Sequence, residues 1–246
     1  MNYFSFSQLR CYEECPRKYY FQYVLKRFEK KNLAMVFGSA IHSALETYYK
    51  GGTPEQAEER FISEFTKNSV GIKLKNGENL ERGGKIGVKM LNEYFKPENK
   101  PYFDKPKYVE YKFQTILKHP ITQKELDVPI KGVIDLITND GFIVDHKTSA
   151  SMWTLEMVEE DLQKVFYWLA FYSIFGVEPQ GFIFNFLIKR VNEPKFDNQA
   201  VEVNKSQMLY CIDYVKFITD EIKKERFPRN IGKQCRYCPN RLLCLP

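Results

Sequence analysis

The sequence predicts an α/β fold in which helices cover the faces of a central mixed β-sheet. Three segments rich in β-forming residues follow one another, and the turn Asn139–Gly141 joins the last two. A fourth segment, Gly181–Lys189, is an almost continuous apolar run, which is typical of a strand buried on both faces. Segments with helical spacing of apolar residues surround these strands. We expect the remaining strands at Tyr108–Leu117, Leu126–Thr138 and Phe142–Lys147, with a short one near Val201.

Helices are predicted from apolar periodicity and from residues that start or stop a helix. Ile41, Leu45 and Tyr48 recur at helical spacing, and Thr53–Pro54 supplies an N-cap followed by proline at the first helical position. The Gly- and Lys-rich stretch Val70–Gly87 is predicted to be a loop. We expect helices at Ser5–Lys26 with an interruption at Pro16, and at Gly38–Lys50, Thr53–Lys67, Val88–Phe95, Leu155–Phe175 and Ser206–Arg226.

These elements are expected to form a single domain over residues 1–246. Length alone fits one large domain or two small ones, but 43% apolar residues, including 20 Phe and 16 Tyr, can fill one α/β core. The helices within residues 51–100 would form an insertion in this domain. Residues 227–246 would form a basic, cysteine-rich tail.

Composition indicates where the protein is located and which classes of partner it can bind. The net charge of +6 is a mild excess, which permits an anionic partner without requiring one. The first residues lack the apolar region of a signal peptide, and no stretch approaches the roughly 20 apolar residues of a membrane helix. We therefore expect a cytoplasmic protein with no membrane partner. Its six cysteines would be reduced, serving as metal ligands or as buried small side chains.

Two carboxylates and a lysine stand out in the predicted hairpin. Asp145 and Lys147 lie two residues apart, so alternation along a strand points both to one face and His146 to the other. Asp135, on the neighbouring strand, can meet them there. Carboxylate oxygens suit Mg²⁺ or Mn²⁺, which bind phosphate oxygens. The alternative is a surface ion pair, but the flanking apolar residues of Val133–Ile134 and Ile143–Val144 favour a buried site.

Several motifs resemble those of a known nuclease superfamily. Gly132–Asp135 and Asp145–Lys147 resemble the two core motifs of the PD-(D/E)XK nucleases, with Asp145 where Glu is also common. Gly38–His42 resembles the GxxxH motif of the RecB-like branch, and Gln163–Tyr167 resembles its QxxxY motif. The motifs occur in the order of that branch. The nearest resemblance is to AddB-type nuclease domains, CRISPR-associated adaptation exonucleases and phage RecB-like exonucleases.

The resemblance implies a restriction-endonuclease-like core and a role for each matching residue. The expected metal ligands are His42, Asp135, Asp145 and the backbone carbonyl of His146. Lys147 would orient the attacking water or neutralise charge in the transition state. Gln163 and Tyr167, which lie four apart on one helix face, would act in catalysis by positioning the substrate strand or the catalytic lysine. Glu110 is a possible accessory acid. Without the other motifs, a single histidine such as His42 on an apolar helix would be interpreted as a core residue.

The cysteines form a second candidate site. Cys235 and Cys238 make a CxxC pair, and Cys244 follows six residues later, which is a partial metal-ligand set. The segments Ser7–Tyr20 and Cys235–Cys244 resemble the opening signature and the cluster-binding tail of the RecB-like branch, which makes Cys15 the fourth ligand. Four thiolates can hold either zinc or an iron–sulfur cluster, and the resemblance favours [4Fe–4S]. Cys11 is a rival ligand or a core residue, and we prefer the core.

Cys211 lies among apolar residues of the last predicted helix and is expected in the core.

The function that the resemblance implies is metal-dependent hydrolysis of DNA by an exonuclease acting on single-stranded ends, with a helicase or an integrase as a possible partner. Two alternatives stay open: a nucleic-acid-binding or structural module with a vestigial site, and a zinc-stapled module that binds a protein. The cations near the cysteines could track a phosphate backbone; they are Arg229, Lys233, Arg236 and Arg241.

Overall fold

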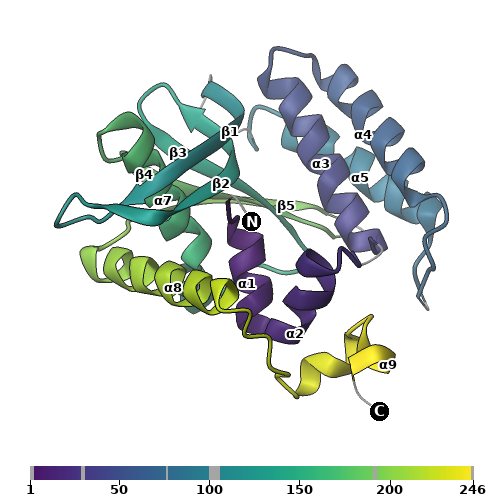
Figure 1. The fold of residues 1–246 in the computed structure, drawn as a ribbon. Coiled ribbons are helices and arrows are strands. Elements are labelled where there is room, and N and C mark those ends of the chain that lie inside the picture. The colour runs from purple at the N-terminus through teal and green to yellow at the C-terminus, as the bar shows by residue number, and fades with distance from the viewer. Residues whose placement is uncertain (1–2, 29–30, 76, 100–105, 191–192, 245–246) are drawn as a thin grey trace.

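The computed structural model describes residues 3–28, 31–75, 77–99, 106–190 and 193–244. Its centre is a five-stranded mixed sheet in the order β1-β2-β3-β4-β5, in which only the β3–β4 pair is parallel. Figure 1 shows helices packed on both sides of this sheet, so the predicted fold class is confirmed. The strands are β1 (Pro106–Lys118), β2 (Glu125–Thr138), β3 (Phe142–Ser149), β4 (Gly181–Ile188) and β5 (Lys195–Val201).

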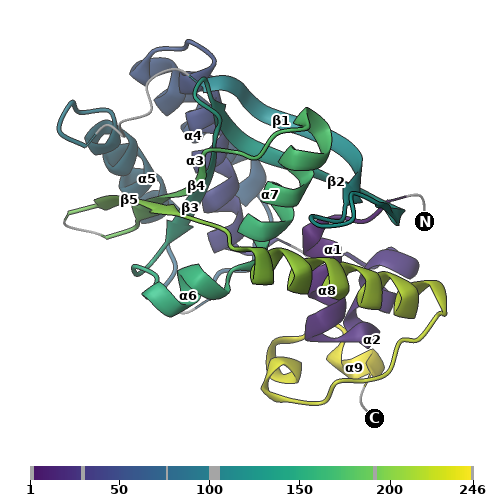
Figure 2. The same ribbon diagram turned by 90° about the vertical axis from the view of Figure 1, so that its left-hand side faces the viewer.

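The helices fall into two groups around the sheet. Helices α3 (Leu33–Tyr49), α4 (Pro54–Ser69) and α5 (Leu80–Tyr94) lie together on one side, whereas the others lie on the opposite side or below it (Figures 1 and 2). The others are α1 (Phe6–Glu14), α2 (Pro16–Tyr19) with a π-helical turn Tyr20–Val24, α6 (Leu155–Glu160), α7 (Leu162–Phe175), α8 (Lys205–Lys223), a 3₁₀ turn Lys233–Tyr237 and α9 (Arg241–Cys244).

Strand β4 is the centre of the core, because all eight of its residues are buried. Phe182, Phe184 and Phe186 contribute to the large cluster that includes side chains of α1, α7 and α8. Leu187 points to the opposite face and joins the cluster formed by α3, α4 and α5. Burial on both faces explains the continuous apolar run that identified this strand in the sequence. Within the described residues, no helix combines the length and the apolar character needed to span a bilayer.

One loop prediction was wrong, because the Val70–Gly87 stretch contains the start of α5. Asn79 caps this helix, and its side chain accepts a hydrogen bond from the backbone of Arg82. Glycines normally weaken helices, but here they make room for the facing helix α4. A Cβ built on Gly87 would lie 1.9 Å from the ring of Phe61. The predicted helix therefore runs over Leu80–Tyr94 and not over Val88–Phe95.

Three other boundaries also differ from the prediction. The long helix at 155–175 is broken at Asp161, whose side chain accepts a hydrogen bond from the Lys164 backbone and so caps α7. Helix α3 starts at Leu33, five residues before the expected Gly38, because Asn32 caps it. Strand β5 is a full strand and pairs with Phe182–Ile188 of β4. Pro16 interrupts the first helix as expected.

Candidate active site

The site forms where the hairpin of β2 and β3 opens. The two strands pair at Leu136–Val144 and Ile137–Ile143, next to the turn, and then diverge. Strand β3 remains paired along its whole length with β4. In place of a ladder bond, a carboxylate oxygen of Asp135 accepts a hydrogen bond from the backbone N–H of His146 at 2.7 Å.

A row of polar side chains links β3 to α7. The ammonium group of Lys147 lies 2.7 Å from a carboxylate oxygen of Asp145 and donates to the side-chain oxygen of Gln163 at 2.7 Å. The amide of Gln163 in turn donates to the hydroxyl of Tyr167 at 3.2 Å. The side chains of Asp145 and Lys147 are only 7% and 17% exposed. The four residues expected to act together are therefore in contact, in a largely buried row.

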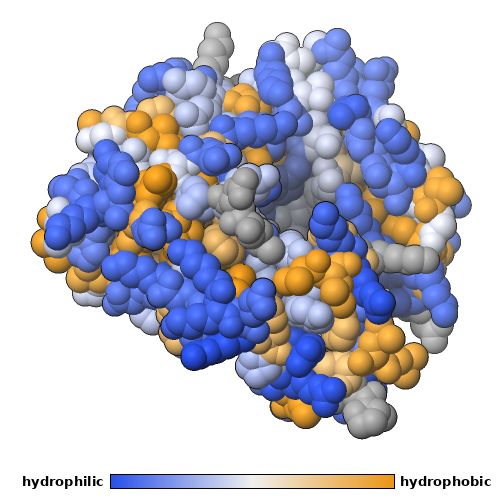
Figure 3. Space-filling view, viewed as in Figure 1, coloured by the Kyte–Doolittle hydropathy of each residue, from blue (hydrophilic) through white to orange (hydrophobic). Residues whose placement is uncertain are grey.

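A second group surrounds Asp135 on the side of α3. His42 lies with Nδ1 3.5 Å from a carboxylate oxygen of Asp135. Ligand atoms of His42, Glu110 and Asp135 all lie within 4.8 Å of one another. Among the described residues, this is the group whose spacing fits a metal ion. In the space-filling view a hollow opens in this face, between the sheet and α3 (Figures 1 and 3).

Glu110 reaches this group through an unusual backbone conformation. Its φ is +50°, whereas its neighbours Val109 and Tyr111 keep their antiparallel partners on β2. The left-handed region is rare for residues other than glycine, and such strain persists where the surrounding structure enforces it, often at functional sites. The structure therefore places the possible accessory acid beside His42 and Asp135.

Burial and mutual charge shift the pKa values of this cluster. Burial, followed by repulsion from Asp135, raises the pKa of Glu110 to about 7. Burial also raises the pKa of Asp145 to about 6, although Lys147 opposes that shift. Burial works to lower the pKa of His42, but the nearby carboxylates, Asp135 first, outweigh it and raise the pKa to about 9. Near pH 7 the metal-free site thus holds more protons than free side chains would, because burial disfavours the charges of Glu110 and Asp145 and the carboxylates stabilise protonated His42.

His146 points its side chain away from Asp145 and Lys147, as strand alternation predicts. Its Nδ1 lies 2.7 Å from the amide nitrogen of Asn185, and its ring stacks on Tyr49 with centroids 5.7 Å apart. Burial lowers the pKa of His146 to about 4, so the imidazole is neutral near pH 7. The side chain therefore anchors β3 to β4 and α3, and only the backbone of this residue faces Asp135.

Sequence reasoning missed the roles of two residues beside the site. A Cβ built on Gly132 would lie 2.6 Å from the ring of Phe113 and 3.2 Å from that of Tyr167. Glycine thus leaves room for the tyrosine that contacts Gln163. Trp153 lies under the Lys147 ammonium group, 5.4 Å from it to the ring centroid. A glycine inside a strand pattern was the available signal for the first of these.

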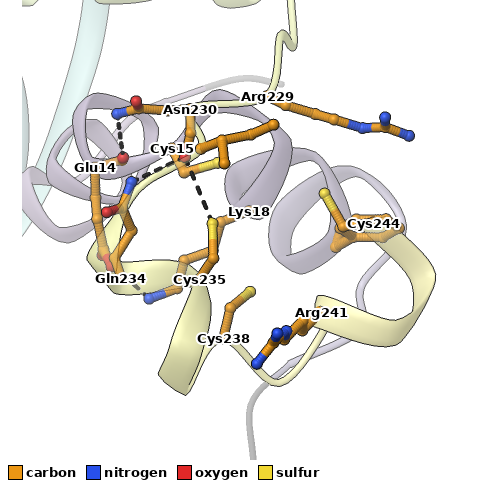
Figure 4. Close-up of a pocket in the computed structure, with 12 residues that line it drawn as sticks. Glu14, Cys15, Lys18, Arg229, Asn230, Gln234, Cys235, Cys238, Arg241 and Cys244 are labelled. Atoms are coloured by element: carbon orange, nitrogen blue, oxygen red, sulfur yellow. Dashed lines mark hydrogen bonds and ion pairs between the residues drawn. The ribbon is translucent and has the colours of Figure 1, made fainter. Parts of the chain in front are cut away.

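The structure also brings together cysteines from the two ends of the chain. Cys15, Cys235, Cys238 and Cys244 line one pocket, and Figure 4 shows the four side chains around a common space. Cys11 is not among its lining residues, and its thiol donates to the side chain of Gln22. Cys211 is fully buried in α8, as expected.

Cations share this cysteine pocket. Lys18, Arg229 and Arg241 are among the residues that line it. Four thiolates would concentrate negative charge there, which nearby cations stabilise. The carboxyl-terminal segment is also tied to the first helix, because the side chain of Asn230 donates to the backbone oxygen of Glu14 at 2.9 Å.

Comparisons with known proteins give the family of the chain and a solved structure with the same fold. No curated protein gives a significant match. In the crystal structure of a "Putative exonuclease" from Eubacterium rectale, the alignment covers 96% of this chain and 88% of that chain, with 19% identity and a TM-score of 0.64, which shows a shared fold. The crystal structure of SSO0001 aligns over 85% and 84% of the two chains at 14% identity, but its TM-score of 0.36 carries no argument. The family model "PD-(D/E)XK nuclease superfamily" matches residues 3–245. The chain therefore belongs to the PD-(D/E)XK nuclease superfamily.

Proposed function

We propose that this chain is a Mg²⁺- or Mn²⁺-dependent deoxyribonuclease of the RecB-like branch, an exonuclease that acts on single-stranded ends. The observation that carries the proposal is the convergence of His42, Glu110 and Asp135 within 4.8 Å, next to the Asp145–Lys147 pair. One imidazole nitrogen and carboxylate oxygens are ligands that suit these ions. The elevated pKa values of Glu110 and Asp145 mark a site whose negative charge a cation would offset.

Each residue has a part in hydrolysis under this proposal. A bound divalent ion would polarise the scissile phosphate and lower the pKa of a bound water. His42, Glu110, Asp135 and Asp145 would hold the ion, with the backbone carbonyl of His146 as a further ligand.

Lys147 is placed to stabilise charge that develops on the phosphate. Its neighbour Asp145 opposes the effect of burial and raises its pKa, so it stays protonated near pH 7. Gln163 and Tyr167 fix the position of this ammonium group, which makes them positioning residues. A preorganised cation in a buried site acts more strongly than one in water.

The proposed organisation is a single nuclease domain over residues 1–246, with the helical insertion at 51–100 and a cluster-binding tail at 227–246. DNA is the expected substrate of the superfamily. The motifs resembling RecB-like exonucleases and the "Putative exonuclease" neighbour support the exonuclease assignment. Single-stranded ends arise when a duplex is unwound or processed, so a helicase or an integrase acting on the same DNA is the proposed class of partner.

We also propose a [4Fe–4S] cluster on Cys15, Cys235, Cys238 and Cys244. These four cysteines line one pocket, which supports a site made of four thiolates. Such a site can hold zinc or an iron–sulfur cluster, and the resemblance to the RecB-like branch favours the cluster. Bound at both ends of the chain, the cluster would stabilise the fold and carry out no redox chemistry on DNA.

The nuclease proposal is tested with labelled oligonucleotides and purified protein. Single-stranded, blunt duplex and circular single-stranded DNA are incubated with Mg²⁺, Mn²⁺ or EDTA, and an RNA of the same sequence is the substrate control. We expect linear single strands to be degraded from an end only when the ion is present. Asp135→Asn and Asp145→Asn should abolish cleavage while the protein still folds, as a cooperative melting transition would show, whereas Asp213→Asn, an exposed aspartate on α8, should cleave normally. Wild-type cleavage rates in either site variant would refute the site.

A further inference from the structure

A groove starts at the candidate active site and runs toward the amino terminus. One end is lined by Gln163 and Tyr167 of α7. One wall is the segment that leads into α1, and the other wall is the hairpin of β1 and β2. The described residues that line the groove are Tyr3, Ser5, Phe6, Ser7, Arg10, Lys112, Phe113, Gln114, Lys131, Gly132, Val133, Gln163 and Tyr167.

The amino-terminal wall is held by the edge of β2 that β3 leaves open. The backbone N–H of Phe4 donates to the oxygen of Pro129 at 3.0 Å, and the N–H of Lys131 donates to the oxygen of Phe4 at 2.8 Å. Phe4 thus pairs with Ile130 as a short parallel bridge. The two walls therefore have a fixed separation, as a built binding site requires.

The groove is positively charged. Arg10 lies on one wall, and Lys112 and Lys131 lie on the other. No carboxylate occurs among the described residues that line it. Within the described part of the chain, none of these three cations forms an ion pair with an acidic side chain. Their charges are therefore available to an anionic ligand.

Aromatic side chains lie among these cations. The ammonium group of Lys131 sits 3.9 Å from the centroid of the Tyr3 ring. A cation–π contact positions an ammonium group without neutralising its charge, so its N–H groups remain able to bind phosphate. Tyr3 is partly exposed, whereas Phe6 on the same wall is buried in the core, so Tyr3 is the ring that a base can reach. Cationic grooves that combine phosphate contacts with aromatic rings are typical of single-strand binding sites.

We propose that this groove binds the single DNA strand being degraded, with its phosphates on Arg10, Lys112 and Lys131. The proposal rests on the proposed function and adds the path of the strand to it. Because Gln163 contacts Lys147, a phosphate at this end of the groove lies next to the catalytic row. The strand would then follow β2 away from Asp135, passing between α1 and the hairpin. The cations near the cysteine pocket lie outside this path.

The test is salt-dependent binding of a fluorescent single-stranded oligonucleotide in EDTA, where metal-dependent cleavage does not occur. The double variant Arg10→Ala/Lys131→Ala removes one cation from each wall. Loss of two phosphate contacts from a single strand makes the negative slope of log K against log salt shallower by about 1.4. It also weakens affinity about 10-fold near physiological salt. Because Lys131 is half-buried, Arg10→Ala/Lys112→Ala, which changes two exposed residues, provides a second variant with the same expected effect.

Two control variants separate the groove from general charge and from the rival path. Lys67→Ala/Lys216→Ala removes the same charge from exposed positions on α4 and α8 and should match the wild type. Lys233→Ala/Arg236→Ala, in the tail, should also keep the wild-type slope. Unchanged affinity and slope in both groove variants, with a wild-type protein that binds, would overturn the groove alone. A wild-type protein that neither binds nor cleaves the oligonucleotide would overturn the groove and the proposed function together.

Discussion

Replacing Glu110 by glutamine should stabilise the metal-free protein and weaken its metal binding. Glu110 lies within 4.8 Å of His42 and Asp135, and its pKa is raised from the ordinary 4.5 to about 7 by burial and by the charge of Asp135. A carboxylate held in such a place destabilises the fold whenever it is ionised. Glutamine keeps the shape of the side chain and removes its charge.

The magnitude and the pH window follow from that pKa. Below pH 4.5 Glu110 is protonated in both the folded and the unfolded protein, so glutamine changes little. As pH rises from 4.5 toward 7, Glu110 loses its proton in the unfolded wild-type protein but keeps it in the folded one. The free energy of unfolding of the wild type therefore falls through this pH range. A pKa change of one corresponds to about 1.4 kcal/mol, and because the side chain is partly exposed, solvent screening leaves about 1–2 kcal/mol at pH 8. For a chain of this size that is a rise in melting temperature of roughly 2–6 °C.

The same substitution should lose most of this stabilising effect when metal is present. If the substitution raises the dissociation constant for Mn²⁺ tenfold, the free energy by which bound Mn²⁺ stabilises the fold falls by about 1.4 kcal/mol. The assay is thermal melting of wild type and Glu110→Gln at pH 5 and pH 8, with and without Mn²⁺. Glu202→Gln, an exposed glutamate, is the control and should match the wild type throughout. A metal-free variant that melts lower than wild type at pH 8, or one with an undiminished response to Mn²⁺, would refute the reasoning.

Three further substitutions test other parts of the structure. Lys147→Met should lower single-turnover cleavage about 10²–10³-fold while leaving the affinity for single strands unchanged; a loss of affinity alone would make Lys147 a phosphate contact. Cys238→Ser should lose the iron measured in anaerobically purified protein, whereas Cys211→Ser should keep it; one zinc per chain in the wild type would replace the iron assignment. In urea unfolding, Gly87→Ala should destabilise by about 1–3 kcal/mol, whereas Gly38→Ala, where a Cβ meets nothing within 4 Å, should not.

Strand periodicity accounts for what the sequence predicted correctly at the site. Asp145 and Lys147 lie on one strand, so alternation alone puts them on a common face and sends His146 to the other. The one-turn spacing of Gln163 and Tyr167 likewise explains their contact. The position of Glu110 was beyond such reasoning, because a left-handed residue inside a strand shifts the direction of the side chain. That conformation is enforced by packing, and no local pattern encodes it.

Tertiary contacts also explain the errors in the fold. The Gly-rich stretch before Val88 resembles a loop on local propensity, since glycine weakens helices. Its glycines instead allow α5 to approach Phe61 and Phe65 of α4, and a burial gain of this kind overrides propensity. The break at Asp161 was hidden for a different reason: apolar residues continue on both sides of it, and only the capping side chain marks the new helix start.

The cysteine pocket and the proposed DNA groove are connected through a single helix. Helix α1 carries Arg10 on the groove wall, and Cys15 follows its last residue. Nine helical residues span about 13 Å, so α1 links the two sites as one short rigid element. The hydroxyl of Tyr12 also donates to the backbone oxygen of Arg226, just before the tail. The proposed catalytic carboxylates lie on β2 and β3, which are held in place by the sheet and not by the tail. Loss of the cluster should therefore loosen the groove wall and weaken strand binding before it disturbs the catalytic residues.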